Sequence, residues 1–174
     1  MKKVLISRML PDAVYPLLEG LDVTRRDKTT PLRSDEMRAA LRDLDGVMCT
    51  LGDDFLADVD EAVAQPRCRV LANFGVGYNH IDVTAAKNAG LVVTNTPGAV
   101  TDATADIAMT LMLMSARRAA EGERLVRSGA WEAWHPTQML GMHLTGKTLG
   151  IVGMGRIGQA VARRCHFGFD MTVK

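Results

Sequence analysis

The feature that most constrains this 174-residue chain is a set of three glycines, Gly153-x-Gly155-x-x-Gly158. The apolar run TLGIV, residues 148–152, precedes them as a predicted strand, and RIGQAVARRC, residues 156–165, follows as a predicted helix. In this setting the first glycine permits a tight turn, the second lets the backbone approach a pyrophosphate, and the third lets helix and strand pack closely. The motif therefore predicts dinucleotide binding at a helix N-terminus; a purely structural turn is the alternative.

Short apolar runs alternate with helical patterns over the first ninety-five residues. Strands are predicted over residues 3–7, 21–26, 46–51, 69–74 and 91–95. Helices are predicted over residues 12–20, 34–44, 54–63 and 83–90, the second with Ser34 as its N-cap. Strands separated by helices favour a parallel sheet, so the predicted fold class is α/β.

Pro97-Gly98 interrupts this alternation and predicts a domain boundary near residue 98. A long helix should follow, capped by Thr101 or Asp102. The glycine- and tryptophan-containing segment Arg127–Gly146 is predicted to be an irregular arm. The predicted domains are residues 1–98 and 99–174.

The glycine motif is usually followed, about 20 residues on, by an acidic residue that binds the adenosine ribose. The strand that would carry it is predicted over residues 169–173, just before the last residue, Lys174. Asp170 lies too early and is interpreted as an ordinary strand-edge residue. The sequence therefore does not choose between NAD and NADP.

A second glycine loop, NFGVGYNHID, covers Asn73–Asp82 directly after a predicted strand. At the carboxyl end of a parallel sheet, the backbone N–H groups around Gly75, Val76 and Gly77 could form an anion-binding nest. A tight turn that serves only the next helix is an equally good interpretation. His80 is interpreted as structural rather than catalytic.

Composition excludes several classes of function. The net charge of +1 argues against nucleic acid as a partner. Cys49, Cys68 and Cys165 form neither a disulfide framework nor a zinc pattern, which favours buried thiols in a reducing compartment and no metal. The most apolar predicted helix segment, Ile107–Ala116, is too short to cross a bilayer, so a cytoplasmic protein without membrane contact is expected.

Three segments together resemble the D-isomer-specific 2-hydroxyacid dehydrogenases, and among them most closely the glyoxylate/hydroxypyruvate reductases. They are NFGVGYNHID, VTNTPGAVTDATADIAMTLML and GKTLGIVGMGRIGQAVARR, in the order and spacing of that family. The resemblance is strong from about Val70 onward, and before that it lies mainly in the β–α alternation. Asn79 is a departure, since many members carry Asp there.

The resemblance implies two α/β domains with the active site in the cleft between them. Residues 1–98 would be a flavodoxin-like substrate domain without its usual C-terminal return segment, and residues 99–174 an incomplete Rossmann domain. It implies that the backbone of Val76 and Gly77 holds the substrate carboxylate and that Leu51 lines the pocket.

The resemblance also assigns the cofactor contacts. Thr104 would lie near the nicotinamide half, unless it only bonds to backbone in its helix, and the pyrophosphate would contact Gly153, Gly155, Arg156, Ile157 and Gly158. Trp134 would reach the active site of a partner subunit, with simple interface packing as the alternative. The implied assembly is a homodimer through residues 100–146.

The implied reaction is NAD(P)H-dependent reduction of a small 2-ketoacid, glyoxylate or hydroxypyruvate, with NADPH slightly favoured over NADH. The family's catalytic Arg, Glu and His would lie beyond residue 174. We therefore expect the 174-residue chain to be a portion of a longer protein and to be inactive alone. A nucleotide-binding regulator without turnover and a non-functional fragment are the alternatives.

Overall fold

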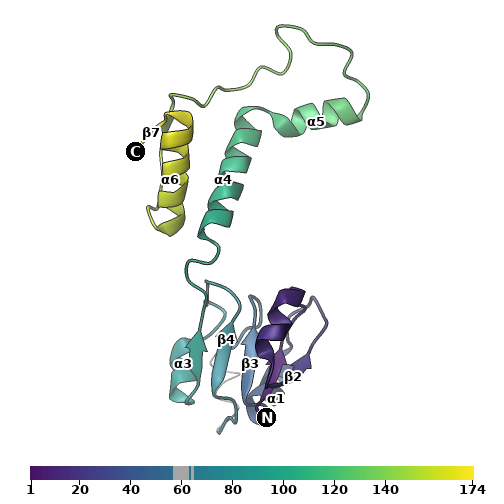
Figure 1. Cartoon of the computed structure of the whole chain (residues 1–174), viewed down its shortest axis with the longest axis vertical. Coiled ribbons are helices and arrows are strands. Elements are labelled where there is room, and N and C mark those ends of the chain that lie inside the picture. The colour runs from purple at the N-terminus through teal and green to yellow at the C-terminus, as the bar shows by residue number, and fades with distance from the viewer. Residues whose placement is uncertain (57–62, 64) are drawn as a thin grey trace. The chain divides into compact units, whose positions relative to one another are not determined.

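The computed structural model describes residues 1–56, 63 and 65–174. The chain folds as two compact units, Met1–Pro97 and Gly98–Lys174 (Figure 1). None of the described helices is both long enough and apolar enough to cross a membrane.

The first unit is built on a parallel sheet of five strands. They are β1 (Lys3–Ile6), β2 (Asp22–Arg25), β3 (Gly46–Cys49), β4 (Val70–Asn73) and β5 (Val92–Thr94). Their order is β2-β1-β3-β4-β5, and every neighbouring pair is parallel. This is the flavodoxin-like order, in which the direction of winding reverses between β1 and β3. The predicted α/β class and flavodoxin-like sheet are confirmed.

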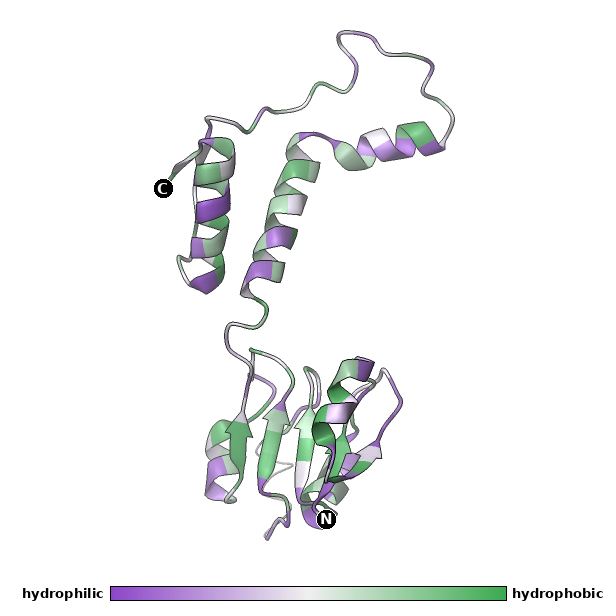
Figure 2. Ribbon diagram, viewed as in Figure 1, coloured by the Kyte–Doolittle hydropathy of each residue, from purple (hydrophilic) through white to green (hydrophobic). Residues whose placement is uncertain are grey.

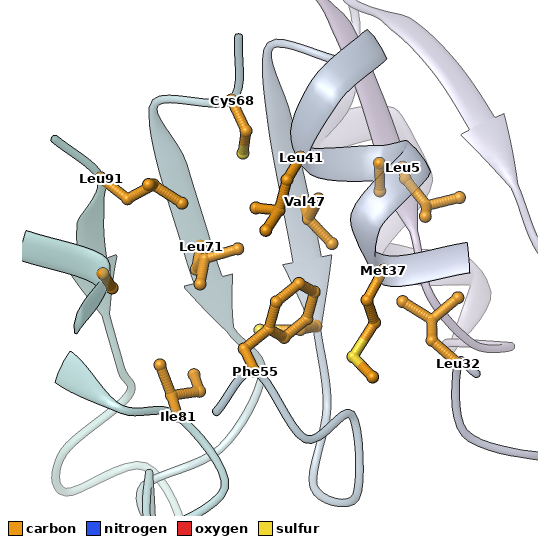
Figure 3. Packing of buried hydrophobic residues seen from close by; sticks show 13 residues of the cluster. Leu5, Leu32, Met37, Leu41, Val47, Phe55, Cys68, Leu71, Ile81 and Leu91 are labelled. Carbon is orange, nitrogen blue, oxygen red and sulfur yellow. The ribbon is translucent and has the colours of Figure 1, made fainter. Parts of the chain in front are cut away.

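The core of this unit lies on one face of the sheet. Helices α1 (Ser34–Asp43) and α3 (Val83–Asn88) contribute buried side chains to it, among them Met37 and Leu41 from α1, and Val47 and Leu71 lie beneath them on the strands (Figure 3). The strands are mostly hydrophobic (Figure 2), and the adjacent residues Leu5 and Ile6 of β1 are both buried, as expected for a parallel sheet.

Two helix predictions in the first unit need correction. Residues Asp12–Leu18 form a 3-10 helix, η1, instead of an α-helix over 12–20, because Pro16 inside the segment has no N–H to donate to an α-helical hydrogen bond. Ser34 is the first helical residue of α1, and the N-cap is Arg33. The backbone N–H of Arg33 donates to the Glu36 carboxylate at 2.9 Å, which satisfies this end of the helix.

The helix predicted over residues 54–63 does not begin where it was expected. Phe55 forms an isolated parallel bridge with Ile81, and the N–H of Asp82 donates to the Phe55 carbonyl at 2.7 Å. The buried Phe55 ring fills the core beside β3 and β4, so tertiary packing holds its backbone extended. Most of the remaining prediction falls on residues 57–62, outside the described residues.

The second unit contains three helices and a two-stranded parallel sheet among its described residues. They are α4 (Thr101–Ala116), α5 (Ala119–Arg127), β6 (Thr148–Leu149), α6 (Arg156–Phe169) and β7 (Thr172–Val173). Met109, Cys165 and Met171 form its small buried cluster. Residues 128–147 contain neither helix nor strand, as predicted for the arm.

The ends of these helices differ from the predictions. The N-cap of α4 is Val100, so neither Thr101 nor Asp102 caps it. The Asp102 carboxylate instead accepts a hydrogen bond from the Arg164 guanidinium of α6 at 3.0 Å. Asp170 is not a strand-edge residue, because it ends α6 in the left-handed conformation with φ 50° and thereby shortens the predicted strand 169–173.

Candidate functional site

The first candidate site lies at the carboxyl edge of the five-stranded sheet. In open α/β sheets ligands bind beyond the carboxyl ends of the strands, at the point where the strand order reverses. Here that point lies between β1 and β3, and the segments that follow β1, β3, β4 and β5 all emerge along this edge.

A buried carboxylate braces two of these segments. Asp53, after β3, accepts hydrogen bonds from the hydroxyl of Ser7 and from the backbone N–H groups of Leu32 and Thr50, the last two at 2.8 Å. The Arg8 guanidinium lies 3.8 Å away. Because Asp53 is fully buried and already satisfied by these donors, it serves to hold the loop and is not available as a general base.

Arg8 and Leu51 connect the buried Asp53 carboxylate to the glycine loop. The Arg8 Nη2 donates to the Leu51 carbonyl at 2.6 Å and fixes the backbone there. A Cβ placed on Gly75 would lie 3.9 Å from the Leu51 Cγ, so the exposed leucine side chain stands beside the loop that follows β4. The structure thus brings Leu51 and the Val76–Gly77 segment to one place.

Two asparagine side chains hold the carbonyl groups of the glycine loop. The Asn73 Nδ2 donates to the carbonyls of Gly75 at 3.1 Å and Gly77 at 2.8 Å. The Asn95 Nδ2 donates to the carbonyl of Val76 at 2.9 Å. Three successive carbonyls are therefore paired with protein donors.

The N–H groups of the same loop differ from one another. The N–H of Gly75 donates to the Asn73 carbonyl at 2.9 Å. Within the described part of the chain, the N–H groups of Val76 and Gly77 have no such acceptor, and no described atom lies within 4 Å of a Cβ placed on Gly77. Two adjacent unpaired donors beside open space are suited to a carboxylate or another small anion.

His80 and Cys49 are two further residues of a catalytic type near this edge, and both are buried. His80 is buried, and its Nε2 lies 3.1 Å from the Asn73 Oδ1. Burial raises the pKa of Cys49 to about 12, and the negative charge of Asp53 adds to the effect. The Cys49 thiol therefore stays protonated and is a poor nucleophile.

The second candidate site is the turn between β6 and α6. Gly153 has φ +100°, a backbone conformation that L side chains rarely adopt. A Cβ on Gly158 would lie 2.2 Å from the Gly153 carbonyl oxygen, so the helix approaches the turn as closely as it does only because residue 158 has no side chain. A Cβ on Gly155, in contrast, would meet no described atom within 4 Å.

The N-terminus of α6 presents free N–H groups at this turn. Gly155 is the N-cap and supplies no side chain to the helix, and the N–H of Gln159 is the first to reach its carbonyl, at 2.9 Å. The preceding N–H groups, from Arg156, Ile157 and Gly158, have no acceptor among the residues that the structure describes and are left for an anion. Open space at Gly155 and free donors beside it fit a pyrophosphate.

Thr104 and Trp134 lie elsewhere in the second unit. Thr104 is exposed in the first turn of α4, and its hydroxyl has no hydrogen bond within the described residues, so the alternative of a backbone-bonded threonine finds no support. Trp134 is 76% exposed in the irregular segment. Trp131 donates from its indole nitrogen to Gln138 at 3.2 Å.

Four residues that hold the first site in shape were not predicted from the sequence, namely Asn73, Asn95, Asp53 and Arg8. A signal was present for two of them, because each asparagine directly follows an apolar strand run, in VLAN and VVTN. A polar side chain at such a position needs partners once it is buried.

No group of three or more His, Cys, Asp or Glu side chains suitable for a metal ion occurs among residues 1–56, 63 and 65–174.

Comparisons with known proteins agree on one family. The profile of the D-isomer specific 2-hydroxyacid dehydrogenase catalytic domain matches residues 4–166. The glyoxylate reductase of Thermococcus kodakarensis is 43% identical over 98% of this chain and 52% of its own length. The glycerate dehydrogenase of Hyphomicrobium methylovorum is 39% identical over 99% of this chain and 53% of its own.

A solved structure from Thermus thermophilus superposes with a TM-score of 0.89 at 41% identity, covering 98% of this chain and 54% of that one. The chain thus spans about half the length of the curated relatives that it matches.

Proposed function

The chain belongs to the D-isomer-specific 2-hydroxyacid dehydrogenase family, and on that premise we propose that the full-length protein reduces a small 2-ketoacid, glyoxylate or hydroxypyruvate, with NADPH or NADH. The observation that carries the proposal is the turn at residues 153–158, where open space at Gly155 adjoins the free N–H groups of α6. Relatives that are named glyoxylate reductase and glycerate dehydrogenase support the choice of substrate class.

In this proposal the second unit, taken as residues 99–174, holds the dinucleotide. Gly153, Gly155, Arg156, Ile157 and Gly158 contact the pyrophosphate through backbone groups, and the exposed Thr104 hydroxyl contacts the nicotinamide half. The bound nicotinamide supplies the hydride. NADPH is slightly favoured by the resemblance alone.

The first unit, taken as residues 1–98, holds the substrate. The free N–H groups of Val76 and Gly77 donate to its carboxylate, which places the ketone carbon at a fixed distance from the loop. Leu51 forms an apolar wall beside it. His80, whose Nε2 is engaged by buried Asn73, does not donate the proton.

The acid that protonates the carbonyl oxygen and the arginine that orients the ketoacid lie, by resemblance, outside these 174 residues. We therefore propose that the 174-residue chain alone is inactive. The test compares the two proteins at verified mass, following oxidation of NADPH and NADH with glyoxylate and with hydroxypyruvate. Turnover by the full-length protein only is expected. Absence of turnover with any small 2-ketoacid would favour a nucleotide-binding regulator, and turnover by the 174-residue chain would refute its proposed inactivity.

We also propose a homodimer through residues 100–146. This region carries exposed apolar side chains on and after α5, with Val126 61%, Leu140 66% and Trp134 76% exposed. Large apolar and aromatic side chains that remain exposed are common in interfaces. Sedimentation velocity should give a dimer that weakens in a Trp134→Ala, Leu140→Ala variant, and a wild-type monomer at all concentrations would rule the interface out.

A further inference from the structure

The loop that follows β4 has an unusual division of its backbone groups. The carbonyls of Gly75, Val76 and Gly77 all accept hydrogen bonds from asparagine side chains, and the Gly75 carbonyl also accepts from the Thr96 N–H at 3.1 Å. The N–H groups of Val76 and Gly77 remain unpaired within the described residues. The loop's acceptors are therefore occupied by the protein itself, while two of its donors stay free for an external acceptor.

Planarity of the peptide bond connects these two observations. In a trans peptide unit the carbonyl of one residue and the N–H of the next point in opposite directions. When Asn73 holds the Gly75 carbonyl, it also sets the direction of the Val76 N–H. When Asn95 holds the Val76 carbonyl, it sets the direction of the Gly77 N–H. Each asparagine thus aims one N–H group that it does not touch.

His80 determines which way the Asn73 amide faces. Asn73 is 2% exposed, and its Oδ1 lies 3.1 Å from the His80 Nε2 while its Nδ2 serves the two glycine carbonyls. Complementarity requires the His80 Nε2 to carry a hydrogen, since an amide oxygen only accepts. Without that donor, a flipped Asn73 amide would place its oxygen against the glycine carbonyls.

We propose that Asn73, Asn95 and His80 are positioning residues that pre-aim the N–H groups of Val76 and Gly77 at the substrate carboxylate. The inference rests on the proposed function, in which this loop holds that carboxylate. Donors that are fixed before the ligand arrives need no reorganisation when it binds, which is the condition under which such groups are most effective.

The test is a titration of the isotope-labelled full-length protein with oxamate, an unreactive 2-ketoacid analogue, followed by amide NMR at Val76 and Gly77. A sodium chloride titration at matched ionic strength is the control for general anion effects. In the wild-type chain both amide resonances should shift with oxamate and not with chloride.

Asn95→Ala should weaken oxamate binding about five-fold, the effect of one lost hydrogen bond. Asn73→Ala should weaken it about ten-fold, because two hydrogen bonds to the loop are lost and only the Thr96 N–H still holds the Gly75 carbonyl. Asn79→Ala is the matched control. Asn79 lies in the same loop region, is exposed, and has no side-chain hydrogen bond within the described residues, so its loss should change affinity by less than about two-fold.

His80 supplies a second, milder pair of variants in case Asn73→Ala does not fold. His80→Leu should weaken oxamate binding, and His80→Gln should restore it, because the glutamine amide can donate to Asn73. If His80 had a merely structural role, His80→Gln would not restore oxamate affinity at Val76 and Gly77 while its thermal stability still differed from that of the wild type.

The outcomes separate the two proposals. If the Val76 and Gly77 amide resonances of the wild type do not shift with oxamate, the loop does not bind the substrate carboxylate, and this inference is wrong as well. Oxamate binding that is equally tight in wild type, Asn95→Ala and His80→Leu would overturn the positioning role and leave the substrate loop intact.

Discussion

Residues 75–77 and residues 153–158 are both glycine-containing segments that follow a strand of a parallel sheet. Both present backbone N–H groups that find no acceptor in the described part of the chain. They reach that state in different ways. At residues 75–77 neither glycine has positive φ, and the side chains of Asn73 and Asn95, outside the segment, hold the backbone. At residues 153–158 the missing side chains themselves set the shape, through positive φ at Gly153 and close approach at Gly158.

The difference shows that a glycine-rich motif has two physical meanings. In the second unit Gly153 and Gly158 are structurally required, because residue 153 has positive φ and a side chain at residue 158 would overlap the turn. In the first unit a Cβ on Gly77 would meet open space, so the same residue type there leaves room beside the donors. A substitution that adds a Cβ should therefore destabilise the protein at Gly153 or Gly158 much more than at Gly77.

The largest expected effect is on the stability of the second unit. In Gly158→Val the new Cβ would lie 2.2 Å from the Gly153 carbonyl oxygen, and overpacking of this kind costs about 3 kcal/mol of unfolding free energy. Gly168→Val is the matched control on the same helix, because a Cβ there meets nothing within 4 Å, and it should change stability by less than about 0.5 kcal/mol. Hydrogen exchange of the α6 amides measures both, and equal protection in the two variants would contradict the close-approach argument.

The next effect is on cofactor affinity without loss of fold. Gly155 has φ −76° and ψ −163°, which any residue adopts, and a Cβ there is unobstructed. Gly155→Val should nevertheless fill the space used by the pyrophosphate and weaken dinucleotide binding at least ten-fold, about 1.4 kcal/mol. Calorimetric titration of the full-length protein with NADPH and NADH, with Gly168→Val as control, measures the change. Unchanged affinity for both cofactors would make the turn purely structural.

The smallest effect is expected at the first loop. Gly77→Ala should change the unfolding free energy by less than about 0.5 kcal/mol, since the position is exposed and unstrained. Gly153→Ala should cost more than about 1 kcal/mol, because alanine at φ +100° is strained. Thermal melts of the two variants give the comparison directly. A Gly77→Ala variant as unstable as Gly153→Ala would show that the two turns do not differ in this way.

Much of the fold was predictable because hydrophobic pattern and turn chemistry are local. The strands of the first unit lie within one or two residues of their predicted ends, and the glycine motif is a strand-to-helix turn as expected. Two of the errors fall where a distant group competes with a local preference. Asp102 pairs with Arg164, sixty-two residues away, and does not cap α4, and Phe55 extends toward Ile81 where a helix was expected.

The sequence by itself determined the α/β class, the position of the glycine turn and the candidate residues Leu51, Val76 and Gly77. The class and the turn follow from periodicity and from motifs in consecutive residues, whereas the roles of Leu51, Val76 and Gly77 were implied by the resemblance to a known family. Only the tertiary structure decided that Asn95, on a neighbouring strand's end, holds the Val76 carbonyl and that His80 sets the Asn73 amide. Hydrogen bonds between loops depend on strand order and register, which bring residues far apart in the chain to one edge of the sheet.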